Sequence, residues 1–295
     1  MSAAAPTPEP RPFAVHALTA LLAVTALATA AVEWLNWYYA VDGGYALFVR
    51  TGWALLRSLL FLVLIFHLWR GRQGAAPFGL ILAVTTIFSV ARLVVPKQGY
   101  PALPGIAGFA VVAVLCLGVV LLLYRSASVR EYLARPRTRW WIGRDGIQRR
   151  PVEPRPHVPG WVLTTRVAVF SYSALMLVAC VVSVGLLFDG RPALLPLIVV
   201  WFVFALVVSY VALFLSIFLV KGRRWARVLL VGLTLVVLLV HLPLCAALLG
   251  ADGLVRDGGP LLVAALLALW GLWRAGRNGH FTQAPTRPAR EPSNA

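Results

Sequence analysis

The residues best suited to chemistry in this sequence are charged side chains that interrupt long apolar segments. Arg57 lies near the centre of the apolar run 46–69, and Arg50 lies seven residues before it, on the same helical face. Glu33 and Arg92 stand at the ends of two neighbouring apolar runs. Charged residues inside a bilayer are costly, so they are the first candidates for a binding site. These four residues form the predicted buried polar site.

Two interpretations of Arg57 follow from its position. The first is an anion site, or a contact with a lipid phosphate, inside a bundle of helices. The second is a structural arginine, either bonded to helix carbonyls and to hydroxyl groups such as those of Ser58 or Thr85, or with its side chain extended toward the membrane surface. In either case Arg57 should face the bundle rather than lipid, while Arg50 is the expected partner of Glu33. The arginine is not repeated 151 residues later, where Val208 stands.

Several kinds of chemistry are disfavoured by what the sequence lacks. No Asp or Glu lies near the centre of an apolar run, which argues against a proton- or sodium-coupled carrier. The three cysteines lie far apart in separate runs, so neither a zinc site nor a redox pair is indicated. The sequence therefore predicts no catalytic residue, no metal site and no cofactor. His241-Leu242-Pro243 predicts a kink or a break in its helix.

The elements that must position these residues are membrane-spanning helices. The chain has 295 residues, of which 60% are hydrophobic and only 13% are charged, with a mean hydropathy of +0.83. Soluble domains carry about 25% charged residues, so a soluble enzyme is excluded. A crossing needs about 20 apolar residues. Eight segments pass that test or come close: 13–37, 46–69, 75–95, 104–124, 161–188, 193–220, 228–250 and 259–275.

The basic residues indicate the orientation of these segments. With eight crossings, 20 of the 27 Lys and Arg residues fall on one side of the membrane, together with both termini. The positive-inside rule makes that side cytoplasmic. The sequence thus predicts a multi-pass protein of the cell inner membrane, with both termini in the cytoplasm. Its net charge of +17 is interpreted as a topology signal with affinity for anionic lipid headgroups, and not as nucleic-acid binding.

The expected organisation is all-α, with eight transmembrane helices in two parallel four-helix units. The predicted segments are a disordered tail 1–12, the first unit 13–124, a basic Pro-rich cytoplasmic loop 125–160, the second unit 161–275 and a disordered basic tail 276–295. Proline density in the loop predicts extended backbone rather than a folded domain, apart from a short helix over Ser128–Leu133. Residues of this loop expected to contact lipid or a partner are Arg137, Arg139, Trp140, Trp141, Arg149 and Arg150.

The two units have the pattern of an internal duplication. At an offset of 151 residues, Gly71-Arg72 matches Gly222-Arg223, in both cases just after the second apolar run of a unit. Because each unit has an even number of crossings, the two copies must point the same way in the membrane. These Gly-Arg junctions resemble a motif of uncharacterised bacterial multi-pass membrane proteins, a likeness that implies no activity. The abundant Ala, Arg, Trp and Pro are consistent with a GC-rich bacterial genome.

Three functions remain open from the sequence. The leading hypothesis is a non-enzymatic membrane scaffold, sensor or complex subunit, whose basic loop contacts anionic lipid or another membrane or cytoplasmic protein. The alternative is a transporter of a small solute or lipid, with Arg57 binding an anion. The third is an enzyme that modifies a lipid within the membrane.

Overall fold

The computed structural model describes residues 11–39, 44–94, 102–134, 138–143, 146–151 and 159–278. The first half contains α1 (Phe13–Tyr38), α2 (Tyr45–Trp69), α3 (Ala75–Val90), the 3₁₀ turn η1 (Ala91–Val94), α4 (Ala102–Arg125) and α5 (Ala127–Ala134). The strands are β1 (Thr138–Gly143) and β2 (Gly146–Pro151). The second half contains α6 (Gly160–Ser183), α7 (Gly185–Phe188), η2 (Pro192–Leu194), α8 (Leu195–Val220), α9 (Arg224–Gly253), the π-helical turn η3 (Leu254–Gly258) and α10 (Gly259–Arg277).

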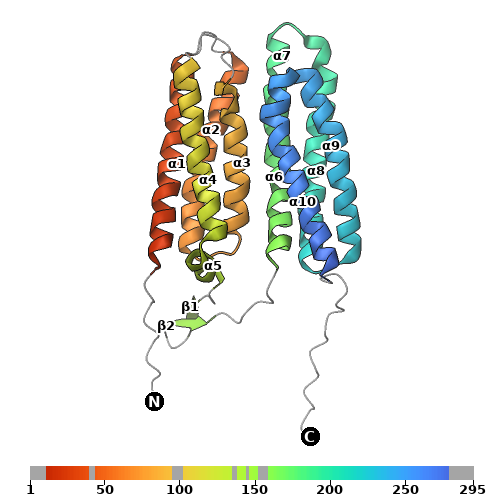
Figure 1. The fold of residues 1–295 in the computed structure, drawn as a ribbon. Helices are drawn as coiled ribbons and strands as arrows, with labels where there is room; N and C mark the ends of the chain where they lie inside the picture. The colour runs from red at the N-terminus through yellow and green to blue at the C-terminus, as the bar shows by residue number, and fades with distance from the viewer. Residues whose placement is uncertain are drawn as a thin grey trace, which may run out of the picture.

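The described part of the chain is helical apart from one short hairpin, and its long helices lie side by side (Figure 1). Within the described residues, six helices are long and apolar enough to cross a membrane. One of these six runs continuously from Arg224 to Arg277 and so includes α9, η3 and α10. Gly250 interrupts it with a φ of 69°, and α10 then runs back along α9 (Figure 1). The chain is therefore a multi-pass membrane protein by the length and composition of its helices.

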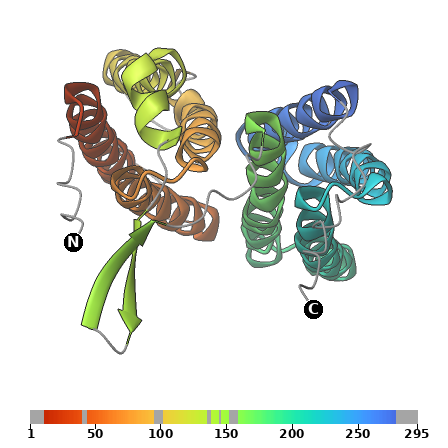
Figure 2. The same cartoon turned by 90° about the horizontal axis from the view of Figure 1, so that it is seen from below.

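The buried apolar side chains form two clusters. One belongs to α1–α5, and the other belongs to α6–α10 together with Ile81 of α3. The helices are packed in the same cyclic order in both groups: α1 contacts α2 and α4, with α3 between them, and α6 contacts α8 and α10, with α9 between them. Figure 2 shows the two groups next to each other, seen along the helices.

The two groups meet along α2 and α3 on one side and α6, α10 and η3 on the other. Gly259 allows α10 to approach α3 closely, since a Cβ there would lie 2.6 Å from the ring of Phe88. We call this contact region the junction. We call the end at which α1 begins and α10 ends the terminal end, and the opposite end the distal end (Figure 1).

Matching turns follow α2 and α8 at the terminal end. Gly71 has a φ of 59° and Gly222 a φ of 73°, a left-handed conformation that glycine adopts without steric cost. The amide of Gly71 donates to the carbonyl of Leu68, and that of Gly222 to the carbonyl of Leu219. Each α-helix thus ends in the same capping geometry at positions 151 residues apart.

The connection between the halves differs from its prediction. The short helix expected over Ser128–Leu133 is present as α5, but the following residues form an antiparallel hairpin instead of extended chain. Trp140 pairs with Arg149 and Arg139 with Arg150 in its register. The β-branched and aromatic residues of β1 favour such pairing, and the one proline within the two strands, Pro151, is the last residue of β2.

Candidate functional site

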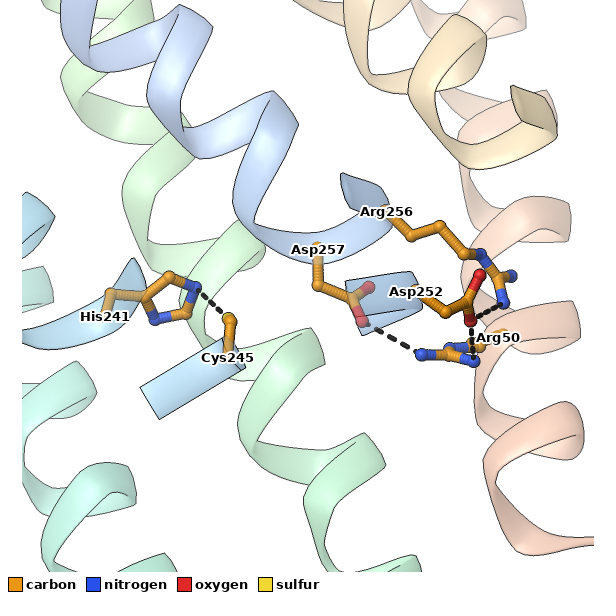
Figure 3. A network of polar contacts seen from close by, with 6 residues as sticks. All are labelled: Arg50, His241, Cys245, Asp252, Arg256 and Asp257. Atoms are coloured by element: carbon orange, nitrogen blue, oxygen red, sulfur yellow. Dashed lines mark hydrogen bonds and ion pairs between the residues drawn. The ribbon is translucent and has the colours of Figure 1, made fainter. Parts of the chain in front are cut away.

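An ion-pair network at the distal end of the junction joins the two groups of helices (Figure 3). Arg50 of α2 places its Nη1 3.4 Å from Asp252 and its Nη2 3.1 Å from Asp257. Arg256 contacts the same Asp252 oxygen at 3.3 Å, one helical turn away. Asp257 is nearly buried, with 9% of its side chain exposed, whereas Asp252 is 42% exposed. We call these four residues the distal clasp.

The second half contributes to the clasp through the turn between α9 and α10. Gly250 leaves helical geometry, and the π-helical turn η3 follows before α10 begins at Gly259, with Pro260 in its first turn. A π turn carries an extra residue and so reorients the side chains on it, which is one reason why such turns recur at functional sites. Here the turn directs Arg256 and Asp257 into the protein, where both are buried.

Arg57 lies deeper in the junction, at the middle residue of α2. Its side chain is 2% exposed, and its Nη2 donates a hydrogen bond of 2.5 Å to the hydroxyl of Ser89 on α3. The guanidinium also lies 5.8 Å from the ring of Trp53. No carboxylate in the described part of the chain forms an ion pair with Arg57, and its buried Nε has no hydrogen-bond partner there. Glu33 and Asp257 act on this charge only through space.

A small cavity lies between Arg57 and the clasp. Its volume is about 10 Å³, the room that a single water-sized particle needs. It is lined by residues of α2, α3, α6, η3 and α10: Arg50, Trp53, Arg57, Thr85, Ser89, Leu175, Val178, Arg256, Asp257 and Pro260. Three arginines thus face one lining carboxylate and its neighbour Asp252. The lining is rich in hydrogen-bond donors and positive charge, which suits an acceptor with a negative charge.

A second buried polar cluster lies within α8 and α9 and carries no formal charge. The indole Nε1–H of Trp201 donates to Nδ1 of His241 over 3.2 Å. Because indole is only a donor, Nδ1 must be the acceptor, and the ring proton sits on Nε2. That Nε2 lies 3.3 Å from Sγ of Cys245 (Figure 3). The indole N–H and the imidazole N–H of this cluster therefore each have an acceptor.

The structure does not bring all of the predicted site residues together in one site. Arg57 is buried with a hydroxyl partner on α3, one of the kinds of partner expected for it. The expected pairing of Arg50 with Glu33 is wrong, because Arg50 reaches the aspartates of the other half and Glu33 instead accepts from Nδ2 of Asn36 over 3.2 Å. Arg92 lies in η1, and its side chain is outside the described part of the structure.

The predicted contact residues of the basic loop are described only in part. Arg137 lies outside the described residues. The backbone of the others forms β1 and β2, and their side chains are also outside the description: Arg139, Trp140, Trp141, Arg149 and Arg150.

Sequence reasoning did not assign Asp252, Arg256 and Asp257 to the site. The available signal was their spacing, since Asp and Arg four residues apart share a helical face, and glycines at 250, 253, 258 and 259 mark an unusual turn. Of the two expectations at Pro243, a kink or a break, the break is wrong, because α9 continues through this proline. The described departure of α9 from helical geometry is at Gly250.

The described residues hold no group of three or more His, Cys, Asp and Glu side chains that could bind a metal ion. Cys116, Cys180 and Cys245 are buried and free. No protein-family model, no curated protein and no solved structure matches this chain.

Proposed function

We propose that this chain crosses the bilayer eight times, in two parallel four-helix units, 13–124 and 161–275. The support is that α3 with η1, and α9 and α10 taken as two separate helices, run alongside the other long helices of their groups (Figure 1). Counted this way, the helices divide equally between the two clusters of buried apolar residues.

The two units are copies of one ancestral unit in this proposal. Three observations support the duplication: the offset of 151 residues in the sequence, the same cyclic packing order, and the same left-handed glycine after α2 and after α8. Since four crossings return the chain to its starting side, the copies have the same orientation.

The proposed location is the inner membrane of a bacterial cell, with the terminal end in the cytoplasm. Basic residues gather at the terminal ends of the helices, among them Arg72, Arg125, Arg224 and Arg277, as the positive-inside rule requires of a cytoplasmic face. Reporter enzymes fused within residues 125–160 and after residue 278 should both report the cytoplasm. A periplasmic signal from either fusion would overturn this orientation.

The function that the geometry supports best is the binding and transport of an anion at the junction of the units. The observation that carries this proposal is Arg57, a buried arginine at the middle of a spanning helix with a free Nε and no carboxylate partner among the described residues. A charge at this depth is costly without compensation. Binding sites near the middle of the membrane, between two units, are typical of transporters.

Flux into liposomes tests this function. Purified protein should carry at least one of a panel of anions, comprising chloride, nitrate, phosphate, acetate and a fluorescent phospholipid, faster than protein-free vesicles do. Flux should fall when a second anion competes. If the folded protein carries none of them, transport is excluded.

A scaffold or sensor remains the second candidate, because the distal clasp joins the units and the cavity is small. A sensor would bind the anion without moving it. Saturable binding together with absent flux is the result that selects this candidate, and co-purification of a stable partner through the basic loop would support it further.

A further inference from the structure

We propose that the ligand of this cavity is a single monovalent inorganic anion of about the size of chloride, bound beside Arg57 and enclosed by the distal clasp. This inference rests on the proposed anion-binding function and names its ligand class. The charge, the hydrogen-bonding groups and the size of the cavity each favour such a ligand.

The three arginines around the cavity exceed the two aspartates of the distal clasp by one positive charge. Arg50 and Arg256 are paired with Asp252 and Asp257, whereas Arg57 has no ion pair among the described residues. Glu33 offsets part of this charge through space, but it does not line the cavity. One monovalent anion matches this excess, and a divalent anion would leave a negative charge buried at the same depth.

The hydrogen-bonding groups favour an acceptor without protons of its own. Arg57 Nε and Arg50 Nε are buried donors without partners in the described structure. Ser89 accepts from Arg57, so its own hydroxyl proton remains available to a ligand in the cavity. A halide accepts from several donors at once and needs no acceptor of its own. A water molecule accepts only two hydrogen bonds and must also place its own two protons, for which the described lining offers the Asp257 carboxylate and the hydroxyl oxygens of Thr85 and Ser89.

The size of the cavity excludes larger anions from this conformation. A volume of about 10 Å³ is close to the minimum for one water-sized particle, so a single-atom anion is the largest ligand that small side-chain adjustments can accommodate. A phosphate or carboxylate group would have to displace Asp257 from Arg50 or separate α3 from α10. The close approach of Gly259 to Phe88 opposes that separation.

The experiment measures anion binding to the full chain in mild detergent, independently of transport. Thermal unfolding is followed in sodium gluconate, with chloride, bromide, nitrate, sulfate or phosphate added at constant ionic strength. Chloride and bromide should raise Tm in a saturable manner, and sulfate and phosphate should not. Crystals grown in bromide should show an anomalous scattering peak in the cavity, next to Arg57 and Ser89 and on the side of the distal clasp.

Matched variants locate the effect. Arg57→Gln should weaken bromide binding by about tenfold or more, since hydrogen bonds to charged groups are among the strongest. Ser89→Ala should weaken it less. Arg166→Gln removes an arginine from α6, outside the cavity lining, and should leave binding unchanged. If Arg57→Gln does not fold, Arg57→Lys retains the charge without the donor fork and should still bind, with lower affinity.

The outcomes separate this inference from the function on which it rests. Stabilisation by phosphate, sulfate or an anionic lipid, but not by halides, would overturn the ligand class and leave an anion-binding protein. A folded protein that responds to no anion would overturn both. Halide binding that persists unchanged in Arg57→Gln would show that the ligand binds elsewhere, and would contradict the assignment of this cavity.

Discussion

The junction arginines and the His241 cluster are two buried polar regions that differ in whether they are complete. In the His241 cluster, Trp201 donates to the imidazole and the imidazole faces Cys245. The indole N–H and the imidazole N–H therefore each have a neutral acceptor. Around the junction cavity, Arg57 has one hydroxyl partner and a buried Nε that no described group accepts from. Both regions are enclosed by helices, and only the second has an excess of donors and charge.

This difference separates a packing role from a binding role. A neutral cluster with matched donors and acceptors stabilises the contact between α8 and α9 and requires no ligand. A buried cation without a carboxylate partner retains a desolvation penalty that an incoming anion removes. This difference supports the proposal that the first region stabilises the fold and the second binds a ligand.

Asp257→Asn should give the largest loss of stability. Removing this carboxylate leaves Arg50 with only the half-exposed Asp252, and breaking a buried ion pair costs about 3–5 kcal/mol. Thermal unfolding in detergent measures the loss. The double variant Arg50→Leu with Asp257→Leu should recover part of it, because no unpaired charge remains. The control is Asp189→Asn, at an exposed position after α7. If Asp257→Asn loses no more stability than this control, the clasp does not hold the units together.

His241→Phe should cost less and should leave anion binding intact. Without the imidazole, the buried indole of Trp201 loses its acceptor, which costs about 1–3 kcal/mol. Changing Trp201 to Phe as well removes the unpaired donor and should restore part of the stability. Bromide affinity, measured by the shift in Tm, should equal that of the original chain. Loss of the bromide response would place this cluster in the binding site, and the His241 cluster would then no longer differ from the junction cavity in its role.

Gly71→Ala and Gly222→Ala should give the smallest effects, and the two should be alike. Both positions have a positive φ, where a Cβ costs about 1–2 kcal/mol. Gly232→Ala is the matched control, because Gly232 lies inside α9 with open space around it. This variant should be slightly more stable than the original chain. Unequal losses at the two turns would weaken the proposed equivalence of the two units.

Most of the helices could be predicted from the sequence because apolar runs of bilayer length have few alternative structures. The predicted run 46–69 became α2 (Tyr45–Trp69), and 259–275 became α10 (Gly259–Arg277). In hydrocarbon the backbone must satisfy its own hydrogen bonds, so such a run is a helix whatever its neighbours are. The hairpin was not predicted, because a segment rich in proline disfavours strands locally. The pairing of β1 with β2 is a contact between two segments, which the local composition does not reveal.

The site was predictable only as far as one helix allows. The depth of Arg57 follows from its place in α2, since the rise per residue is fixed. Its neighbours depend on which helices meet, and this is a tertiary property. Arg50 was assigned to the nearby Glu33, whereas its aspartate partners lie more than 200 residues away, on a π-helical turn that the hydropathy pattern does not reveal.

The most direct test of the account replaces Arg57 with leucine and measures both stability and anion flux. An arginine near the bilayer centre costs about 2.5–3.5 kcal/mol on insertion scales, so Arg57→Leu should fold and should unfold at the same or a higher temperature. In liposomes, Arg57→Leu should no longer carry the transported anion. Arg57→Lys should carry it more slowly, and Arg166→Leu should carry it at the original rate. A folded Arg57→Leu protein that carries the anion at the original rate would contradict the central claim that Arg57 binds the anion.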